Sequence, residues 1–315
     1  PLKNKLIPGN VIVENGLLKD LNYNGSLEGF EIIDCKGKIL SPGFLDFRAH
    51  FGEPAEEDIE TFETGTNAAL AGGFTKVCIS PNNHSMLDTP EVIDSINKKS
   101  ECLDINVFPI GCVSRKMEGK ELSEIGLMVN NGAVAISDGK HSIQNAQLIK
   151  NALEYAKMFD IPVINFAKDE SLSSDGFANE SFFSTKMGLP ANPSISESIV
   201  IYRDLEIADF VRGKIHIPLI STEKSVNLIR QYKDKGVQVT ADVSAHHLGL
   251  NEECLNEFDS AYKFEPPLRS EKDMSALIKG LKDGTIDCIV SDHSPHRLED
   301  KEADLLSAQS DSIGL

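Results

Sequence analysis

The sequence predicts an α/β fold, a closed (β/α)8 barrel in which most parallel strands are followed by a helix. Three observations predict it. Apolar, β-branched runs alternate with stretches whose apolar residues recur at i, i+3, i+4 and i+7, and such alternation gives parallel sheets with helical crossovers. The runs are apolar almost throughout, as in a sheet covered on both faces. There are eight of them, which favours a barrel over an open sheet.

The expected strands share a core of branched apolar residues. In chain order they are Lys38–Phe47, Phe74–Ser80, Asn106–Val113, Ala133–Ser137, Pro162–Phe166, Ile215–Ser221, Val237–Val243 and Ile286–Ser291. The clearest helical stretches between them are Glu91–Lys99, Gln144–Phe159, Ile195–Asp209, Thr222–Lys233 and Lys272–Leu281. Glycines that follow several helices, at Gly72-Gly73, Gly236 and Gly284, predict C-terminal caps.

The first 40 residues depart from this alternation. Short apolar runs at Val11–Val13, Leu17–Lys19 and Phe30–Ile33, with a turn at Glu14-Asn15-Gly16, predict antiparallel strands. We therefore expect residues 1–40 to form a small β-sandwich appendage and residues 41–315 to form the barrel.

Composition excludes several classes of function. The 31 Lys and Arg residues against 49 Asp and Glu residues give a net charge of −18, which opposes binding to a phosphate backbone, so no nucleic-acid partner is expected. No apolar run approaches the ~20 residues of a membrane span. The cysteines lie apart without a C-x-x-C pair, which predicts reduced, buried thiols in a cytoplasmic protein; they are Cys35, Cys78, Cys102, Cys112, Cys254 and Cys288.

The chemistry of a barrel of this kind lies at the C-terminal ends of its strands. Arg48 and His50 end the first strand, and because they are two residues apart they lie on the same face. The other residues expected at strand ends are Asn82, Asp138, Phe166, Leu219, His246 and Asp292.

The segment Ser41–His50 resembles the type I dihydroorotases of the amidohydrolase superfamily. Further matches follow in order along nearly the whole chain, at Glu63–Thr66, Ala71–Thr75, Ser80–Asn83, Ser137–Gly139, Ala245–Leu248, Pro266–Arg269 and Ser291–His296. The resemblance implies a TIM barrel of the amidohydrolase type. It also implies hydrolysis of a cyclic amide in pyrimidine biosynthesis, with one or two zinc ions activating a water.

The family's metal site is incomplete in this sequence. The resemblance implies two histidines from strand one, an aspartate after strand four, and one histidine each from strands five and six. His50 and Asp138 match, but the other positions hold Arg48, Phe166 and Leu219. A guanidinium has no lone pair for a metal, so we expect no tightly bound cofactor.

The substrate side departs from the family too. Asp292 matches the aspartate that handles the proton of the attacking water, and Asn82 and His296 match substrate-binding residues. Gly52 stands where the family has a carboxylate-binding arginine. Glu265 stands where many members have asparagine, and its charge would repel an anionic substrate.

Loss of the metal would strand Asp138 and Asp292 in a confined site, which is costly without a partner. We expect Arg48 to be that partner, its guanidinium replacing the charge of the metal. The alternative is that Arg48 points to solvent or pairs with Glu53 or Glu56.

Other polar residues have simpler interpretations. His216 points to the opposite side of its strand from Leu219. The pair His246-His247 is expected to form local hydrogen bonds. Lys140 and Lys168 are expected to be solvated rather than carboxylated, and Cys112 to be a buried packing residue rather than a nucleophile.

These observations predict a catalytically silent dihydroorotase-like protein that acts as a scaffold, with aspartate transcarbamoylase or its own copies in a homo-oligomer as partners. The alternative is an active cyclic amidohydrolase with zinc held by His50, Asp138 and Asp292. By comparison with the family, the chain is expected to end before the eighth helix and the final strands of the appendage. Its start at Lys5–Gly9 also looks abrupt.

Overall fold

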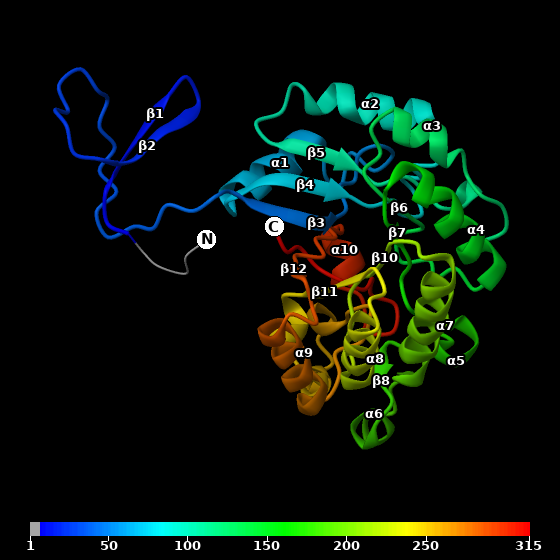
Figure 1. Cartoon of the computed structure of the whole chain (residues 1–315). Coiled ribbons are helices and arrows are strands. Elements are labelled where there is room, and N and C mark those ends of the chain that lie inside the picture. The colour runs from blue at the N-terminus through cyan, green and yellow to red at the C-terminus, as the bar shows by residue number, and fades with distance from the viewer. Residues whose placement is uncertain (1–6) are drawn as a thin grey trace. The chain divides into compact units, whose positions relative to one another are not determined.

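The computed structural model describes residues 7–315 and divides the chain into two units, one up to Pro42 and one from Gly43. The Lys5-Leu6 part of the expected abrupt start lies outside the described residues. In the first unit, strands β1 (Asn10–Glu14) and β2 (Leu17–Tyr23) form an antiparallel hairpin (Figure 1). The turn residues Asn15 and Gly16 both have positive φ, as a two-residue hairpin turn requires.

The third strand expected in this unit, Phe30–Ile33, is not formed. A strand needs a neighbour to pair its backbone groups, and within residues 7–42 the only sheet is the two-stranded β1–β2 pair. The side chains of Ile32 and Ile33 are mostly exposed. The second layer of the expected sandwich is therefore missing from the described residues.

The second unit contains the eight predicted barrel strands. One sheet has the order β3-β4-β5 and the other β12-β11-β10-β7-β6, and all their pairings are parallel. Bridges between Gly111 and Ile136 and between Ala49 and His293 join the two sheets at both edges, which closes the ring. The bounds are β3 Phe44–Ala49, β4 Phe74–Ile79, β5 Asn106–Pro109, β6 Ile136–Ser137, β7 Val163–Ile164, β10 Ile215–Ile217, β11 Val239–Ser244 and β12 Cys288–Val290.

Helices lie outside this ring and cover it (Figure 1). The longer ones are α1 Phe62–Ala71, α2 Pro90–Ser100, α4 Ala146–Ala156, α7 Ile195–Val211, α8 Glu223–Asp234 and α9 Glu271–Asp283. The shorter ones are α3 Ile125–Asn130, α5 Glu170–Ser173, α6 Phe182–Met187 and α10 Leu298–Lys301, and a small parallel pair, β8 (Ala178–Asn179) and β9 (Ala191–Asn192), follows α5.

Local sequence sets where these helices begin and end. The side chains of Asn145, Thr222 and Ser270 accept hydrogen bonds from the first turns of α4, α8 and α9. The predicted cap at Gly284 ends α9 in the left-handed conformation. The five predicted helices are all present, except that residues 157–159 of the second, Gln144–Phe159, form a separate 3-10 turn.

A large apolar core lies between the ring and the helices. Cys78 and Cys112 are buried as expected, but Cys35 and Cys102 are exposed, so the prediction of buried thiols was wrong for those two. They lie in loops, which keep their backbone polar groups near water. None of the helices in residues 7–315 has the length and apolar character of a membrane span.

Candidate functional site

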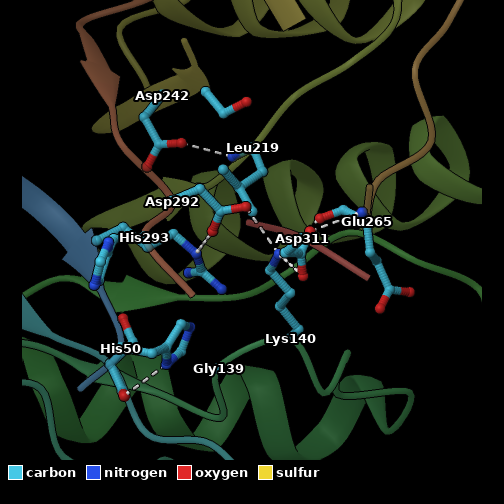
Figure 2. A network of polar contacts seen from close by, with 12 residues as sticks. His50, Gly139, Lys140, Leu219, Asp242, Glu265, Asp292, His293 and Asp311 are labelled. Atoms are coloured by element: carbon cyan, nitrogen blue, oxygen red, sulfur yellow. Dashed lines mark hydrogen bonds and ion pairs between the residues drawn. The ribbon is translucent and has the colours of Figure 1, made fainter. Parts of the chain in front are cut away.

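Two cationic side chains, Arg48 and Lys140, contact Asp292, which follows β12 (Figure 2). Arg48, near the end of β3, places its Nε 3.2 Å from Asp292 Oδ1, and the two side chains are 2% and 3% exposed. The alternatives of a solvent-facing Arg48, or of pairing with Glu53 or Glu56, were therefore wrong. Glu53 instead contacts Lys99, and Glu56 lies nearest His84.

Asp138 has other partners. Its carboxylate accepts hydrogen bonds from the backbone N–H groups of Val113 (2.8 Å) and Ser114 (2.9 Å) and from the Ser114 hydroxyl. Burial raises the pKa of Asp138, although these hydrogen bonds oppose the shift. A contact between Arg48 and Asp138 is not formed, because the carboxylate is engaged by the loop after β5.

Lys140 supplies the second cation of the site. Its Nζ lies 2.8 Å from Asp292 Oδ2, 2.6 Å from Asp311 Oδ2 and 2.8 Å from the Glu265 carbonyl oxygen. Burial lowers the pKa of Lys140, but Asp292 and Asp311 more than offset this and hold it above its ordinary value. The expectation of a solvated lysine was wrong, because the fold brings two carboxylates onto it.

Glu265 and Lys168 form an ion pair with each other. Neither side chain is more than 29% exposed, so Lys168 is not the freely solvated residue expected. Lys168 thus gives a cationic partner to the Glu265 carboxylate, whose charge we expected to repel an anionic substrate.

His50 is buried and neutral. Its Nδ1 lies 3.1 Å from the Ser80 carbonyl oxygen and donates to it, which leaves the lone pair on Nε2. Burial, followed by the charges of Arg48 and Lys140, lowers the pKa of His50 well below its ordinary value. This imidazole could serve as one ligand of a metal.

The residues around His50 do not complete a zinc site. Phe166 and Leu219, which follow β7 and β10, are both 2% exposed and pack with Val290 in a small apolar cluster. Within residues 7–315, no three His, Cys, Asp or Glu side chains are grouped as metal ligands would be. Zinc requires about four donors, so the donor set does not fit the ion.

Gly52 leaves no room for a carboxylate-binding side chain. A Cβ at this position would lie 2.2 Å from the Glu56 carbonyl oxygen and 2.8 Å from that of Glu60. The loop that makes these contacts also places the Glu60 carboxylate 3.1 Å from His293 Nε2. The backbone therefore closes over the place where the family arginine would begin.

The two substrate-side residues are engaged in their own loops. Asn82 Oδ1 accepts from the N–H groups of His84 (3.0 Å) and Ser85 (2.6 Å). His296 is part-buried, with its Nε2 2.7 Å from the Ser310 carbonyl oxygen. Neither side chain contacts Arg48, Lys140 or Asp292 through the hydrogen bonds of the described residues.

His247 confirms the prediction of local hydrogen bonds, with its ring nitrogens 2.8 Å from Ser244 Oγ and 3.0 Å from the Pro266 carbonyl oxygen. For His246 that prediction was wrong: within residues 7–315 its Nε2 has no hydrogen-bond partner, and its ring stacks on Phe264 at 4.6 Å. The ring nitrogens of His216 lie 2.8 Å from Thr240 Oγ1 and 2.8 Å from Asp242 Oδ2.

Cys112 is fully buried, and burial, the largest cause, raises the pKa of its thiol. A thiol of this kind is a packing residue, as predicted, because only the thiolate is a good nucleophile.

Sequence reasoning missed the part played by Lys140, Asp311 and His293. Lys140 carried a signal, since it follows the predicted fourth strand within Asp138-Gly139-Lys140. Asp311 carried none, because no strand or motif precedes it and only the fold brings it to Lys140.

Comparison with known proteins finds a family model and curated relatives that match most of this chain. The model of the dihydro-orotase-like family matches residues 37–225. The dihydroorotase of Acetivibrio thermocellus is 40% identical over 97% of this chain and 72% of that protein. The dihydroorotase of Endomicrobium trichonymphae is 39% identical over the whole chain and 74% of that protein.

Solved structures support the fold. The L-hydantoinase from Arthrobacter aurescens superimposes with a TM-score of 0.73 and 20% identity, over 87% of this chain and 63% of that one. The D-hydantoinase from a Thermus species does so with a TM-score of 0.76 and 20% identity, over 96% and 70%. These likenesses confirm the predicted TIM barrel of the amidohydrolase type.

Proposed function

The chain belongs to the dihydroorotase-like family of pyrimidine biosynthesis, and from this premise we propose that it is a catalytically silent member that acts in the cytoplasm by binding a partner. The observation that carries the proposal is the ion pair between Arg48 and Asp292. This ion pair puts a fixed positive charge where the family holds a metal. It also engages Asp292, the residue that matches the family's proton acceptor.

The contacts of Asp292 oppose a role in proton transfer. One carboxylate oxygen accepts from Arg48 and the other from Lys140. A role in proton transfer would require Asp292 to give up the negative charge that both of these buried cations share. A carboxylate so held supports a structural role.

The substrate side supports the same conclusion. The backbone of Glu56 and Glu60 packs against Gly52, so no side chain can reach out from there to clamp a carboxylate. An anionic cyclic amide would therefore meet neither the usual Lewis acid nor the usual guanidinium.

Metal analysis and a hydrolysis assay test this proposal together. We expect less than about 0.2 zinc per chain after purification without chelators, and no detectable hydrolysis of dihydroorotate. The Acetivibrio thermocellus relative, purified and assayed in parallel, is the control. Stoichiometric zinc with turnover above background would contradict the proposal.

We propose aspartate transcarbamoylase, or further copies of this chain, as the partner of the silent barrel. The family resemblance supports this, since silent dihydroorotase-like chains serve as scaffolds for that enzyme. Light scattering during size-exclusion chromatography, with and without aspartate transcarbamoylase from the same organism, tests it. A monomer that does not shift in the presence of that enzyme would contradict both choices.

A second candidate is an active cyclic amidohydrolase with one metal held by His50, Asp138 and Asp292. The neutral His50 imidazole, with its Nε2 lone pair free of the Ser80 contact, favours it. Titration with zinc followed by a panel of cyclic amides separates the two candidates. Metal uptake that requires His50, together with hydrolysis of any panel member, would favour the enzyme.

A further inference from the structure

Arg48, Lys140 and Asp292 form a cluster at the strand ends, which we call the strand-end cluster. Asp311 adds a carboxylate to it from a segment far along the chain. Its Oδ2 lies 2.6 Å from Lys140 Nζ, and its Oδ1 accepts from the backbone N–H of Glu265 at 2.9 Å. Figure 2 shows Lys140 bridging Asp311 and Asp292. An ammonium and a backbone N–H aimed at one carboxylate make a charge-assisted donor set of the kind that binds anionic ligands.

The backbone at Asp311 is held in an unfavourable conformation. Its φ is +72°, in the left-handed region, which is unfavourable for a residue other than glycine. The segment is held by lysine side chains that donate to its carbonyl oxygens. Lys263 reaches Leu306 (2.9 Å) and Ala308 (2.7 Å), and Lys301 reaches Asp311 itself (2.8 Å).

The charges around Asp292 balance only when Asp311 is in place. Arg48 and Lys140 both contact the Asp292 carboxylate, so two cations share one anion, and Asp311 is the second anion. Even so, Arg48 Nη2 is buried and has no hydrogen-bond partner in the described residues. A buried cationic donor without an acceptor is costly, and it marks a position where the cluster can take another acceptor.

We propose that Lys140 and the Glu265 N–H form a binding site for a small carboxylate, next to Asp292 and its partner Arg48, and that Asp311 is the built-in carboxylate that occupies it. The inference goes beyond the proposed function, because it requires neither the absence of zinc nor the loss of hydrolysis. A free carboxylate of the size of acetate takes the place of Asp311 when the side chain is removed.

The test is to remove the built-in carboxylate and titrate acetate. The variant Asp311→Gly removes the charge and suits the backbone, because glycine adopts a positive φ freely. We expect it to bind acetate at least tenfold more tightly than the unmodified chain in isothermal titration calorimetry. Its melting temperature should rise with acetate, but not with sodium chloride at equal ionic strength.

Removing Lys140 gives the matched control. The double variant Asp311→Gly/Lys140→Gln should lose at least tenfold in acetate affinity relative to Asp311→Gly. Asp311→Asn, which also tolerates a positive φ, keeps the acceptor for the Glu265 N–H and should bind acetate more weakly than Asp311→Gly. Asp311→Asn is the second test if Asp311→Gly does not fold, because acetate binding to Asp311→Asn should still require Lys140.

Two results would overturn the proposal. One is equal acetate affinity in the unmodified chain and in the foldable Asp311 variants. The other is acetate binding by an Asp311 variant that survives the loss of Lys140, since the ion would then bind elsewhere.

Discussion

Two buried polar networks in the barrel differ in how completely their hydrogen bonds are satisfied. The first is the strand-end cluster of Arg48, Lys140, Asp292 and Asp311. The second, which we call the α7 network, joins Glu197 on α7 to the residues that follow β10 and to Arg269. Both networks are shielded from water, so their difference is not one of exposure.

The α7 network is complete. Glu197 accepts from the backbone and hydroxyl groups of Ser221 and Thr222 and from the Ser225 hydroxyl. Arg269 donates to Ser221 Oγ at 3.1 Å, to Asn179 and to the Asn192 carbonyl oxygen. None of these side chains has a buried atom without a partner in residues 7–315.

The strand-end cluster is incomplete and strained. Arg48 Nη2 lacks a partner within the described residues. Asp292 and Asp311 have φ values of +52° and +72°, and Leu219, where the family has a histidine, also has +52°. Strained backbone and unpaired polar groups gather where a fold keeps a ligand site, whereas networks that only hold the fold are satisfied. The strand ends therefore combine a strained backbone with an unpaired buried donor, as ligand sites do.

The largest expected effect is loss of the α7 network's cation. Arg269→Met leaves Glu197 buried without a nearby positive charge and removes donors from three acceptors, so we expect a loss of about 4 kcal/mol in unfolding free energy. Urea unfolding followed by circular dichroism measures it. Arg230→Met, which removes a partly exposed pair with Asp283, is the control and should cost far less than Arg269→Met. Equal losses in Arg269→Met and Arg230→Met would show that the buried α7 network stabilises the fold no more than a surface ion pair does.

The next effect is acid destabilisation through His247. Burial, as the largest cause, lowers the pKa of this histidine to about 4 from an ordinary value of 6.5. A lowered pKa means that the folded state favours the neutral ring. The contribution of the neutral His247 ring to the unfolding free energy is therefore present above pH 6.5. It is lost as the pH falls toward 4, by about 3 kcal/mol.

Unfolding free energies at pH 6.5 and pH 4 check this prediction. The difference between the two pH values should shrink by about 3 kcal/mol in His247→Gln. His84→Gln, which alters a histidine whose side chain is 65% exposed, is the matched control variant. An unchanged pH dependence in His247→Gln would show that the ring is charged in the folded state.

The sequence predicts the barrel and part of the strand-end cluster, but not all of either the fold or the cluster. The barrel and the residues at its strand ends follow from apolar periodicity, and Arg48 and Asp292 could be paired because each ends a strand. Asp311 could not be found, since it lies in a loop without periodicity and reaches Lys140 only through the fold. The strand expected at Phe30–Ile33 is not formed, because the spacing of apolar residues does not tell whether a partner strand is available for pairing.

A smaller effect is expected at the shared anion of the cluster. Asp292→Asn keeps the shape and one acceptor but removes the charge that faces Arg48 and Lys140. Asp311 still neutralises Lys140, so we expect a loss of about 2 kcal/mol. Asp94→Asn, which alters an exposed helix pair with Lys98, is the control and should stay within about 0.5 kcal/mol. A loss as large as that of Arg269→Met would show that the cluster is as structural as the α7 network.

The smallest effect is expected for Arg48→Met, which removes the arginine of the strand-end cluster as Arg269→Met removes that of the α7 network. Arg48→Met leaves Asp292 paired with Lys140 and removes a buried guanidinium whose Nη2 has no partner in the described residues. The lost contact and the relieved desolvation nearly cancel, so the change in unfolding free energy should be under about 1 kcal/mol in either direction. Urea unfolding beside Arg269→Met gives the contrast directly. A loss above about 3 kcal/mol would mean that Arg48 is the indispensable counterion of Asp292 and that Lys140 cannot replace it.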